Sequence, residues 1–97
     1  MDKKILQRAI EAVDLYSKSE KSVLQSLITV SANFVAIASA KYLIKDTGLS
    51  TTTTYAALKS LQQKDMLEKS HKELNSYIIN NHILERVVET YNNQIKK

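Results

Sequence analysis

The chain has 97 residues, with no cysteine, no proline, no tryptophan and a single glycine. Without cysteine it can form no disulfide bond, no thiolate nucleophile and no cysteine-ligated zinc site. With one glycine it has no glycine-rich loop of the kind that cradles phosphates. No apolar run approaches the roughly 18 residues needed to span a membrane, and the N-terminal sequence lacks the apolar block of a signal peptide. We therefore expect a cytoplasmic protein with no membrane partner.

The length favours one domain with one core. We divide residues 1–97 into an N-terminal helix (1–18), a central unit (19–80) and a C-terminal helix (81–97). The formal net charge of +4 is compatible with a polyanionic partner, although charge of this size does not by itself require one.

The stretch from Ser39 to Leu61 predicts two short helices joined by a tight turn at Gly48. A glycine is favoured where a helix ends in the left-handed region, because it has no Cβ. Ser39 and Ser50 stand where each helix would begin, and a serine hydroxyl accepts a hydrogen bond from an unpaired amide of the first turn. Helix, glycine turn and helix together indicate a helix-turn-helix.

The spacing of apolar residues agrees with this prediction. One face of the second helix carries Thr54, Leu58 and Leu61 at intervals of four and three, which is the period of a buried helical face. The other face carries residues suited to a phosphate backbone or to base edges, namely Thr51, Thr52, Tyr55, Lys59 and Gln62.

Residues 37–69 resemble the winged helix-turn-helix of bacterial transcription regulators. The resemblance is carried by Gly48-Leu49-Ser50, Thr52-Thr53, Leu58-Lys59-Ser60-Leu61 and Lys64-Asp65-Met66-Leu67. The chain departs from that pattern at Asp65, where a glycine is usual, and at Ala56-Ala57, where arginine is common. Asp65 is a mild departure, since aspartate also tolerates the left-handed conformation.

The resemblance implies a mainly α (α+β) fold with a three-helix core and a small β-hairpin wing, flanked here by an extra helix at each end. The apolar periodicity of the remaining sequence predicts the other elements. They are helices over 2–18, from Ser19 to about residue 32 and from Asn80 or Asn81 to about Gln94, and strands over 34–37, 66–70 and 76–80, with the wing tip at 71–75.

The same resemblance implies that the chain binds double-stranded DNA, with the helix over 50–64 in the major groove and the wing beside it. The candidate contacts are Ser50, Thr51, Thr52, Thr53, Tyr55, Lys59 and Lys64 from the helix, and Lys69, His71 and Lys72 from the wing. We expect a small homodimeric transcriptional regulator that pairs through its N- or C-terminal helix. Two alternatives stay open. One is a protein-interaction module using the apolar patch of Tyr55, Ala56 and Ala57. The other is a DNA-binding protein of plasmid or phage replication or partition.

Two patterns that imitate catalytic or metal sites are set aside. Asp46-Thr47-Gly48 matches the triplet of aspartic proteases, but that triplet follows an apolar strand, whereas the flanks here have helical periodicity. His71 and His82 have Glu73 and Glu85 nearby, yet their spacing fits no known ligand set. We expect no enzymatic activity, no metal and no cofactor.

Overall fold

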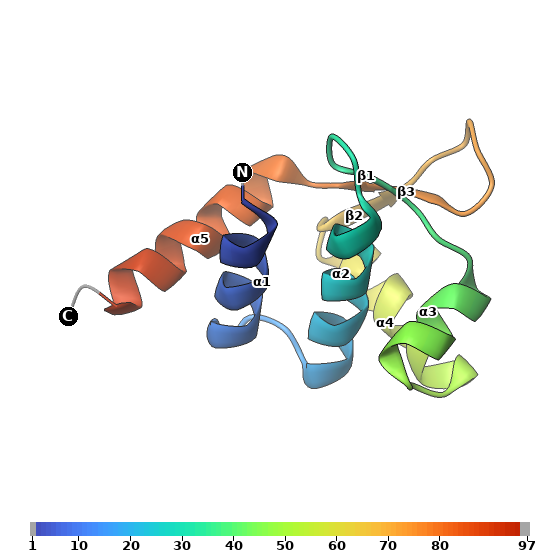
Figure 1. Cartoon of the computed structure of the whole chain (residues 1–97), viewed down its shortest axis with the longest axis horizontal. Helices are drawn as coiled ribbons and strands as arrows, with labels where there is room; N and C mark the ends of the chain where they lie inside the picture. The colour runs from blue at the N-terminus through green and yellow to red at the C-terminus, as the bar shows by residue number, and fades with distance from the viewer. Residues whose placement is uncertain (1, 96–97) are drawn as a thin grey trace.

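The computed structural model describes residues 2–95, which form five helices and one three-stranded antiparallel sheet (Figure 1). In chain order the elements are α1 (Lys3–Ala12), α2 (Lys18–Val30), β1 (Val35–Ile37), α3 (Ala40–Thr47), α4 (Thr51–Gln63), β2 (Leu67–Lys69), β3 (Ser76–Ile79) and α5 (Asn81–Ile95). The helices α2, α3 and α4 pack on one another and make the three-helix core. The strand order is β1-β3-β2, and β2 and β3 form a wing that projects beyond the helices (Figure 1). The predicted winged helix-turn-helix fold is confirmed.

The turn between α3 and α4 has the predicted geometry. Gly48 has a φ of 73°, in the left-handed region, and its amide donates to the Ile44 carbonyl at 2.9 Å. The Ser39 hydroxyl accepts from the Tyr42 amide at 3.1 Å and so caps α3. The serine caps start each helix at a defined residue, and the turn at Gly48 ends the first helix at a defined residue. Together they fix the angle between the two helices.

The N-terminal helix predicted over 2–18 is shorter in the structure, where α1 ends at Ala12 and Val13 is already extended. The next helix is capped by Ser17 and not by Ser19, since the Ser17 hydroxyl and the Glu20 side chain each pair with the other's backbone amide. This is the capping box of the Ser-x-x-Glu pattern. The prediction ran too far because Val13 and Tyr16 are buried although they lie in the connecting segment.

The first strand begins one residue later than predicted. Asn33 and Phe34 both have positive φ, and Ala32 and Val35 exchange two backbone hydrogen bonds of 2.9 and 3.0 Å. This is a two-residue turn of the primed type, which needs positive φ at both central residues. Phe34 therefore lies in the turn, where its carbonyl accepts the Ile79 amide at 2.7 Å.

The wing strands fall within the predicted ranges of 66–70 and 76–80. Asp65 has a φ of 62°, so the aspartate does adopt the left-handed conformation that glycine usually supplies at this turn. The side chains of Leu67, Tyr77 and Ile79 are buried against the core, whereas Glu68 and Ile78 face outward. The wing is thus joined to the core by one face of its sheet.

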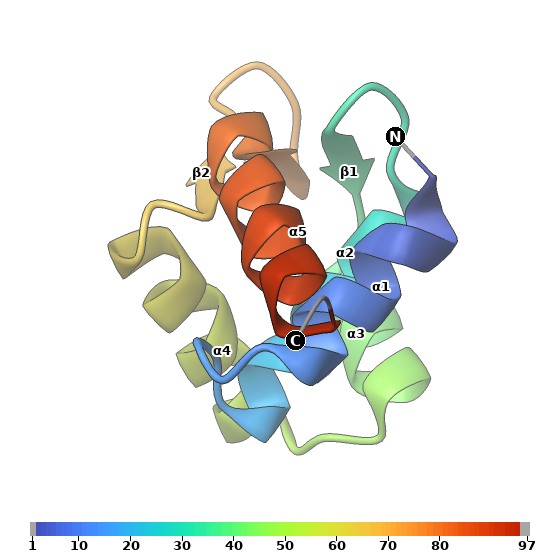
Figure 2. The ribbon, with the colours of Figure 1, turned by 90° about the vertical axis from the view of Figure 1, so that its left-hand side faces the viewer.

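The terminal helices α1 and α5 pack against each other at the end of the molecule away from the wing (Figures 1 and 2). The contact buries Leu6 and Ile10 of α1, and Leu84 and Val87 of α5. Much of the apolar stripe on each helix is therefore covered within the chain itself. Among residues 2–95, no helix is both long and apolar enough to cross a membrane.

One buried carboxylate ties the start of α2 to the end of α4. Lys64 donates to Glu20 at 2.8 Å, and the Ser60 hydroxyl donates to the other carboxylate oxygen at 2.7 Å. The Lys64 ammonium also lies 5.3 Å from the centre of the Tyr16 ring. Burial raises the pKa of Glu20, but the hydrogen bonds from Lys64, Ser17 and Ser60 outweigh it and lower the pKa from 4.5 to about 2.

This lowered pKa predicts how stability depends on pH. The carboxylate stabilises the fold fully above pH 4.5, and this contribution is lost as the pH falls towards 2, because the unfolded chain then binds the proton more tightly. The shift corresponds to about 3 kcal/mol at neutral pH. We expect Glu20→Gln to lower the free energy of unfolding by an amount of that order in urea titrations followed by circular dichroism at pH 7.

The glutamine also mimics the protonated acid. The difference between the wild-type protein and Glu20→Gln should therefore shrink steadily from pH 4.5 to pH 2.5. Equal stability of the two proteins at pH 7 would contradict this assignment.

Candidate nucleic-acid interface

Helix α4 has one face in the core and one face open to solvent. Thr54, Ala57, Leu58 and Leu61 are buried, and this fixes which side chains point outward. The exposed residues are Thr51, Thr52, Tyr55, Ala56, Lys59 and Gln63. No acidic residue lies between positions 50 and 64. The outward face of α4 thus combines hydroxyl, amide, phenol and ammonium groups, and none of them repels a phosphate.

The first turn of α4 is set by Ser50. Its hydroxyl accepts the Thr53 amide at 3.1 Å and donates to the Thr53 hydroxyl at 2.8 Å. The first hydrogen bond within the helix runs from the Thr54 amide to the Ser50 carbonyl at 2.9 Å. The amides of Thr51 and Thr52 come before that bond, at the positive end of the helix dipole. Ser50 and Thr53, both candidate contacts, therefore have a structural role here as the cap.

The inner side of the wing lies next to the open face of α4. Lys69 pairs with Tyr77 across β2 and β3, so both residues share the face of the sheet that looks towards the helices. Burial, and to a lesser degree the neighbouring Tyr55 phenol, raise the pKa of Tyr77. Tyr55 of α4 and Lys69 of the wing therefore border the same surface, as a shared DNA interface requires.

Lys64 is engaged in an ion pair with Glu20 in the structure. It was a candidate phosphate contact, but its ammonium is held by Glu20 and also lies 3.4 Å from the Leu15 carbonyl. Moving it to a phosphate would leave the buried Glu20 carboxylate without its counter-charge, which is costly. We therefore assign Lys64 to the tether between α2 and α4.

The apolar patch proposed for a protein partner is also smaller than the sequence indicated. Ala57 is buried in the core, and only Tyr55, with 56% of its surface exposed, and Ala56 remain outside. Arginine is common near this position in the family that the sequence resembles, and the burial of Ala57 explains why it is absent from position 57 here. An arginine there would have to bury its charge.

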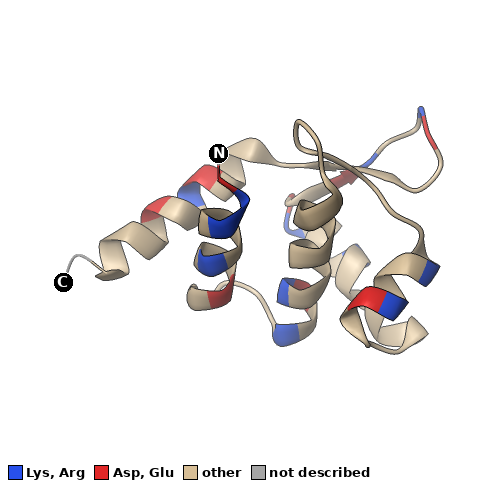
Figure 3. Cartoon of the chain, in the orientation of Figure 1, with Lys and Arg blue, Asp and Glu red and all other residues tan. Residues whose placement is uncertain are grey.

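Sequence reasoning missed two lysines of α3. Lys41 and Lys45 are four residues apart and exposed, so they lie on one face of that helix. Figure 3 shows that the lysines of α3 and of the wing gather at the same end of the molecule. The signal was present in the sequence, as a pair of lysines at helical spacing opposite Leu43. The remaining wing candidates, His71 and Lys72, are exposed in the loop that joins β2 and β3.

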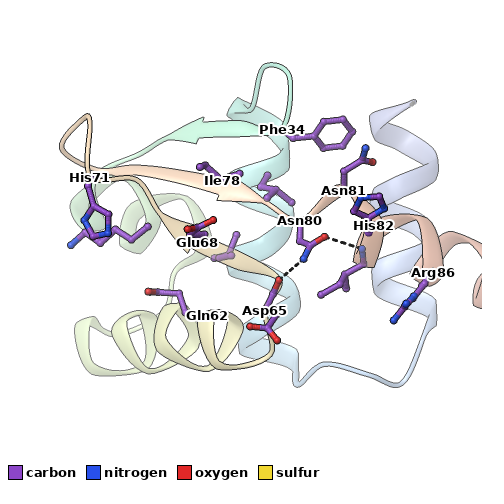
Figure 4. A pocket seen from close by; sticks show the side chains of 14 residues that line it. Phe34, Gln62, Asp65, Glu68, His71, Ile78, Asn80, Asn81, His82 and Arg86 are labelled. Carbon is purple, nitrogen blue, oxygen red and sulfur yellow. Dashed lines mark hydrogen bonds between the residues drawn. The ribbon is translucent and has the colours of Figure 1, made fainter.

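A hollow of about 1050 Å³ lies beside the wing and the start of α5 (Figure 4), and the wing candidates Lys69 and His71 are among its lining residues. Asn80 stiffens its wall, because its side chain donates to the Asp65 carbonyl at 3.0 Å and accepts the Ile83 amide at 3.2 Å. The hollow carries the acidic Asp65 and Glu68 as well as the basic Lys69 and Arg86. Because acidic and basic side chains are mixed in the hollow, it is less suited to binding a polyanion than the exposed face of α4. Within residues 2–95, no three His, Cys, Asp or Glu side chains gather as a metal site would need.

Comparison with known proteins adds one finding. Residues 1–96 match the model of the family described as "Firmicute plasmid replication protein (RepL)". No curated protein and no solved structure matches the chain. Among the functions that the sequence left open, the match favours plasmid replication and displaces transcriptional regulation, which came from the resemblance to transcription regulators.

The capping role of Ser50 can be tested without DNA. Ser50→Ala removes the acceptor of the Thr53 amide and should lower the free energy of unfolding by about 1 kcal/mol. Ser50→Asp keeps a good cap and should leave stability nearly unchanged. Urea unfolding measures both variants. An alanine variant as stable as the aspartate variant would show that the hydroxyl does not cap α4.

Proposed function

Since the chain belongs to the RepL family of Firmicute plasmid replication proteins, we propose that it acts in replication by binding double-stranded DNA through α4 and the wing. The observation that carries the proposal is the open face of α4, which has no acidic residue and lies at the same end of the molecule as the lysines of α3 and the wing. The proposed role is one of binding, and we expect no catalytic activity, no metal and no cofactor. The protein would work in the cytoplasm, where plasmid DNA is found.

In this proposal α4 enters the major groove, whose width admits a helix. The amides of Thr51 and Thr52 point the positive end of the helix at a phosphate. The hydroxyl of Thr52 and the phenol of Tyr55 reach phosphates or base edges, and Lys59 neutralises a phosphate further along the helix. Lys41 and Lys45 of α3 extend the cationic surface on one side of α4.

The wing extends the contact on the other side. Lys69 ends β2 and pairs with Tyr77, which has Tyr55 as a neighbour, and His71 and Lys72 lie in the loop of the wing. Such a hairpin fits the neighbouring minor groove or the phosphates that line it. The chain's two arginines, Arg8 and Arg86, are on α1 and α5. Arginine is the usual partner of guanine edges, so readout here depends more on hydroxyl and amide groups and on the shape of the DNA.

A dimer remains part of the proposal, through the distal half of α5. This helix continues past α1 (Figure 1), and its outer turns carry the half-buried Val88 and Tyr91 and the exposed Ile95. These side chains recur at helical spacing, so a second copy of α5 can cover them. Two recognition helices related by a two-fold axis would meet half-sites about 34–36 Å apart.

The first test of the proposal is fluorescence anisotropy on random-sequence duplex DNA at several salt concentrations. Binding should weaken steeply with salt, because each neutralised phosphate releases a counterion. If binding is seen, selection from a random pool would then recover a preferred site. Absence of binding at low salt would contradict the proposed function.

Lys59→Ala tests the placement of α4. We expect weaker binding to all sequences and a salt slope smaller by about one unit, as the loss of one phosphate contact requires. The matched control is Lys4→Ala, which removes an exposed lysine from α1, away from the interface. The placement is wrong if the two variants change the slope equally.

Ile95→Glu tests the dimer. Ile95 is 64% exposed, so the substitution should leave the fold intact while placing a charge in the proposed contact between subunits. Light scattering coupled to size exclusion should show a monomer for Ile95→Glu and a dimer for the wild-type protein. Asn93→Glu adds the same charge to a neighbouring exposed position and should stay dimeric. A wild-type monomer at all concentrations would rule out this part of the proposal.

A further inference from the structure

Leu74 stands in the loop of the wing, directly after Lys72 and Glu73, with 83% of its surface exposed, the largest fraction among the exposed large apolar side chains of residues 2–95. Its neighbours in the loop are all polar, from Ser70 to Glu73 before it and Asn75 and Ser76 after it. In Figure 1 this loop projects beyond the sheet at the end of the molecule that carries α3. The leucine is therefore presented to whatever the wing touches.

The loop that carries Leu74 is braced at both ends. The Ser70 amide donates to the Ser76 carbonyl at 2.8 Å, and the Lys72 amide donates to the Ser70 hydroxyl at 3.2 Å. On the far side, Asn75 has a φ of 60°, and its carbonyl accepts the Ala38 amide at 2.9 Å. These bonds fix the start and the end of the turn, so the tip is held out from the sheet and does not fold back onto it.

A single exposed apolar residue is ordinary on a protein surface. The position of Leu74, on a hairpin that also carries lysines, is what suggests a functional role for it. Lys69 and Lys72 precede it on the same hairpin, and cations at these places draw the wing towards phosphates. Proteins that contact the minor groove often insert a leucine or another apolar side chain between two base pairs, which unstacks them and kinks the duplex.

We propose that Leu74 is an apolar wedge that enters the duplex between adjacent base pairs when the wing binds, and so locally unwinds the DNA. The inference rests on the proposed function and adds a distortion of the DNA to it. A protein of plasmid replication acts on DNA whose strands must separate. The free energy of binding would drive the wedge and so promote strand separation without nucleotide hydrolysis. The chain has no glycine-rich phosphate-binding loop for such hydrolysis.

The experiment measures unwinding directly and needs no knowledge of the binding site. Relaxed closed-circular plasmid DNA is incubated with the protein and a type I topoisomerase, the protein is removed, and the topoisomers are separated on a gel. Unwinding during incubation leaves the plasmid negatively supercoiled afterwards. Wild-type protein should shift the distribution in proportion to the amount bound, which gel retardation measures on the same samples.

The decisive variants change only the tip. Leu74→Ala should lose the topoisomer shift when compared at equal occupancy, and Leu74→Met, which keeps an apolar side chain of similar volume, should retain it. Glu73→Ala is the matched control in the same loop and should also retain the shift. Circular dichroism checks that each variant is folded, as expected for an exposed position.

The outcomes separate this inference from the function on which it rests. Wild-type protein that binds the plasmid without shifting the topoisomers would overturn the wedge and leave DNA binding standing. An equal shift from Leu74→Ala at equal occupancy would overturn it as well, and would leave Leu74 as a candidate contact for a partner protein. If the wild-type protein fails to retard the plasmid at all, the proposed function fails first and the wedge falls with it.

Discussion

The Glu20 carboxylate is the interaction on which the geometry of the molecule most depends. Its oxygens receive the Ser17 amide, the Lys64 ammonium and the Ser60 hydroxyl, so one side chain closes the capping box of α2 and holds the last turns of α4. A buried carboxylate is stable only with such partners. Any rotation of α4 about its axis would pull Ser60 away and leave an oxygen unpaired, which penalises other orientations of the helix. The Glu20 carboxylate therefore reinforces the orientation of α4 that its buried face sets, and with it the direction in which Tyr55 and Lys59 point.

The wing is coupled to the same helix through the sheet. β3 is the central strand and pairs with β1 on one side and with β2 on the other, so the wing continues the sheet that packs on the core. The short primed turn at Asn33 and Phe34 brings β1 against β3, and the Phe34 carbonyl holds the Ile79 amide. A hairpin of three- and four-residue strands would be marginal by itself. Here the third strand and the buried Tyr77 and Ile79 support it, and Lys69 is held beside α4.

The sequence was most informative where local chemistry and burial agree. The one glycine, the serines that flank the two helices and the apolar spacing of α4 each act within a few residues, so the helix-turn-helix could be predicted nearly to the residue. The error at 13–18 arose because Val13 and Tyr16 continue an apolar period after the helix has ended, and only the Ser17 and Glu20 pattern marked the true boundary. The partner of Lys64 was beyond prediction for a different reason. Glu20 is 44 residues away in the chain, and no local pattern tells which carboxylate a lysine will find.

The removal of Lys64 from the interface changes how the proposed binding must work. The end of α4 contributes to folding, so the cations that remain are spread over α3, the middle of α4 and the wing. In the proposed complex each of these three groups of cations would neutralise a few phosphates. Because the groups lie on separate elements, the DNA would have to curve for all three to make contact at once. Such an arrangement favours sequences that deform easily. The apolar residue in the braced loop of the wing would also favour sequences that deform easily, because an apolar side chain inserts most readily at a flexible base step. In the proposed complex, which has no arginine in the helix-turn-helix, selectivity would therefore rest on deformability of the DNA, with the hydroxyl groups of α4 setting the register.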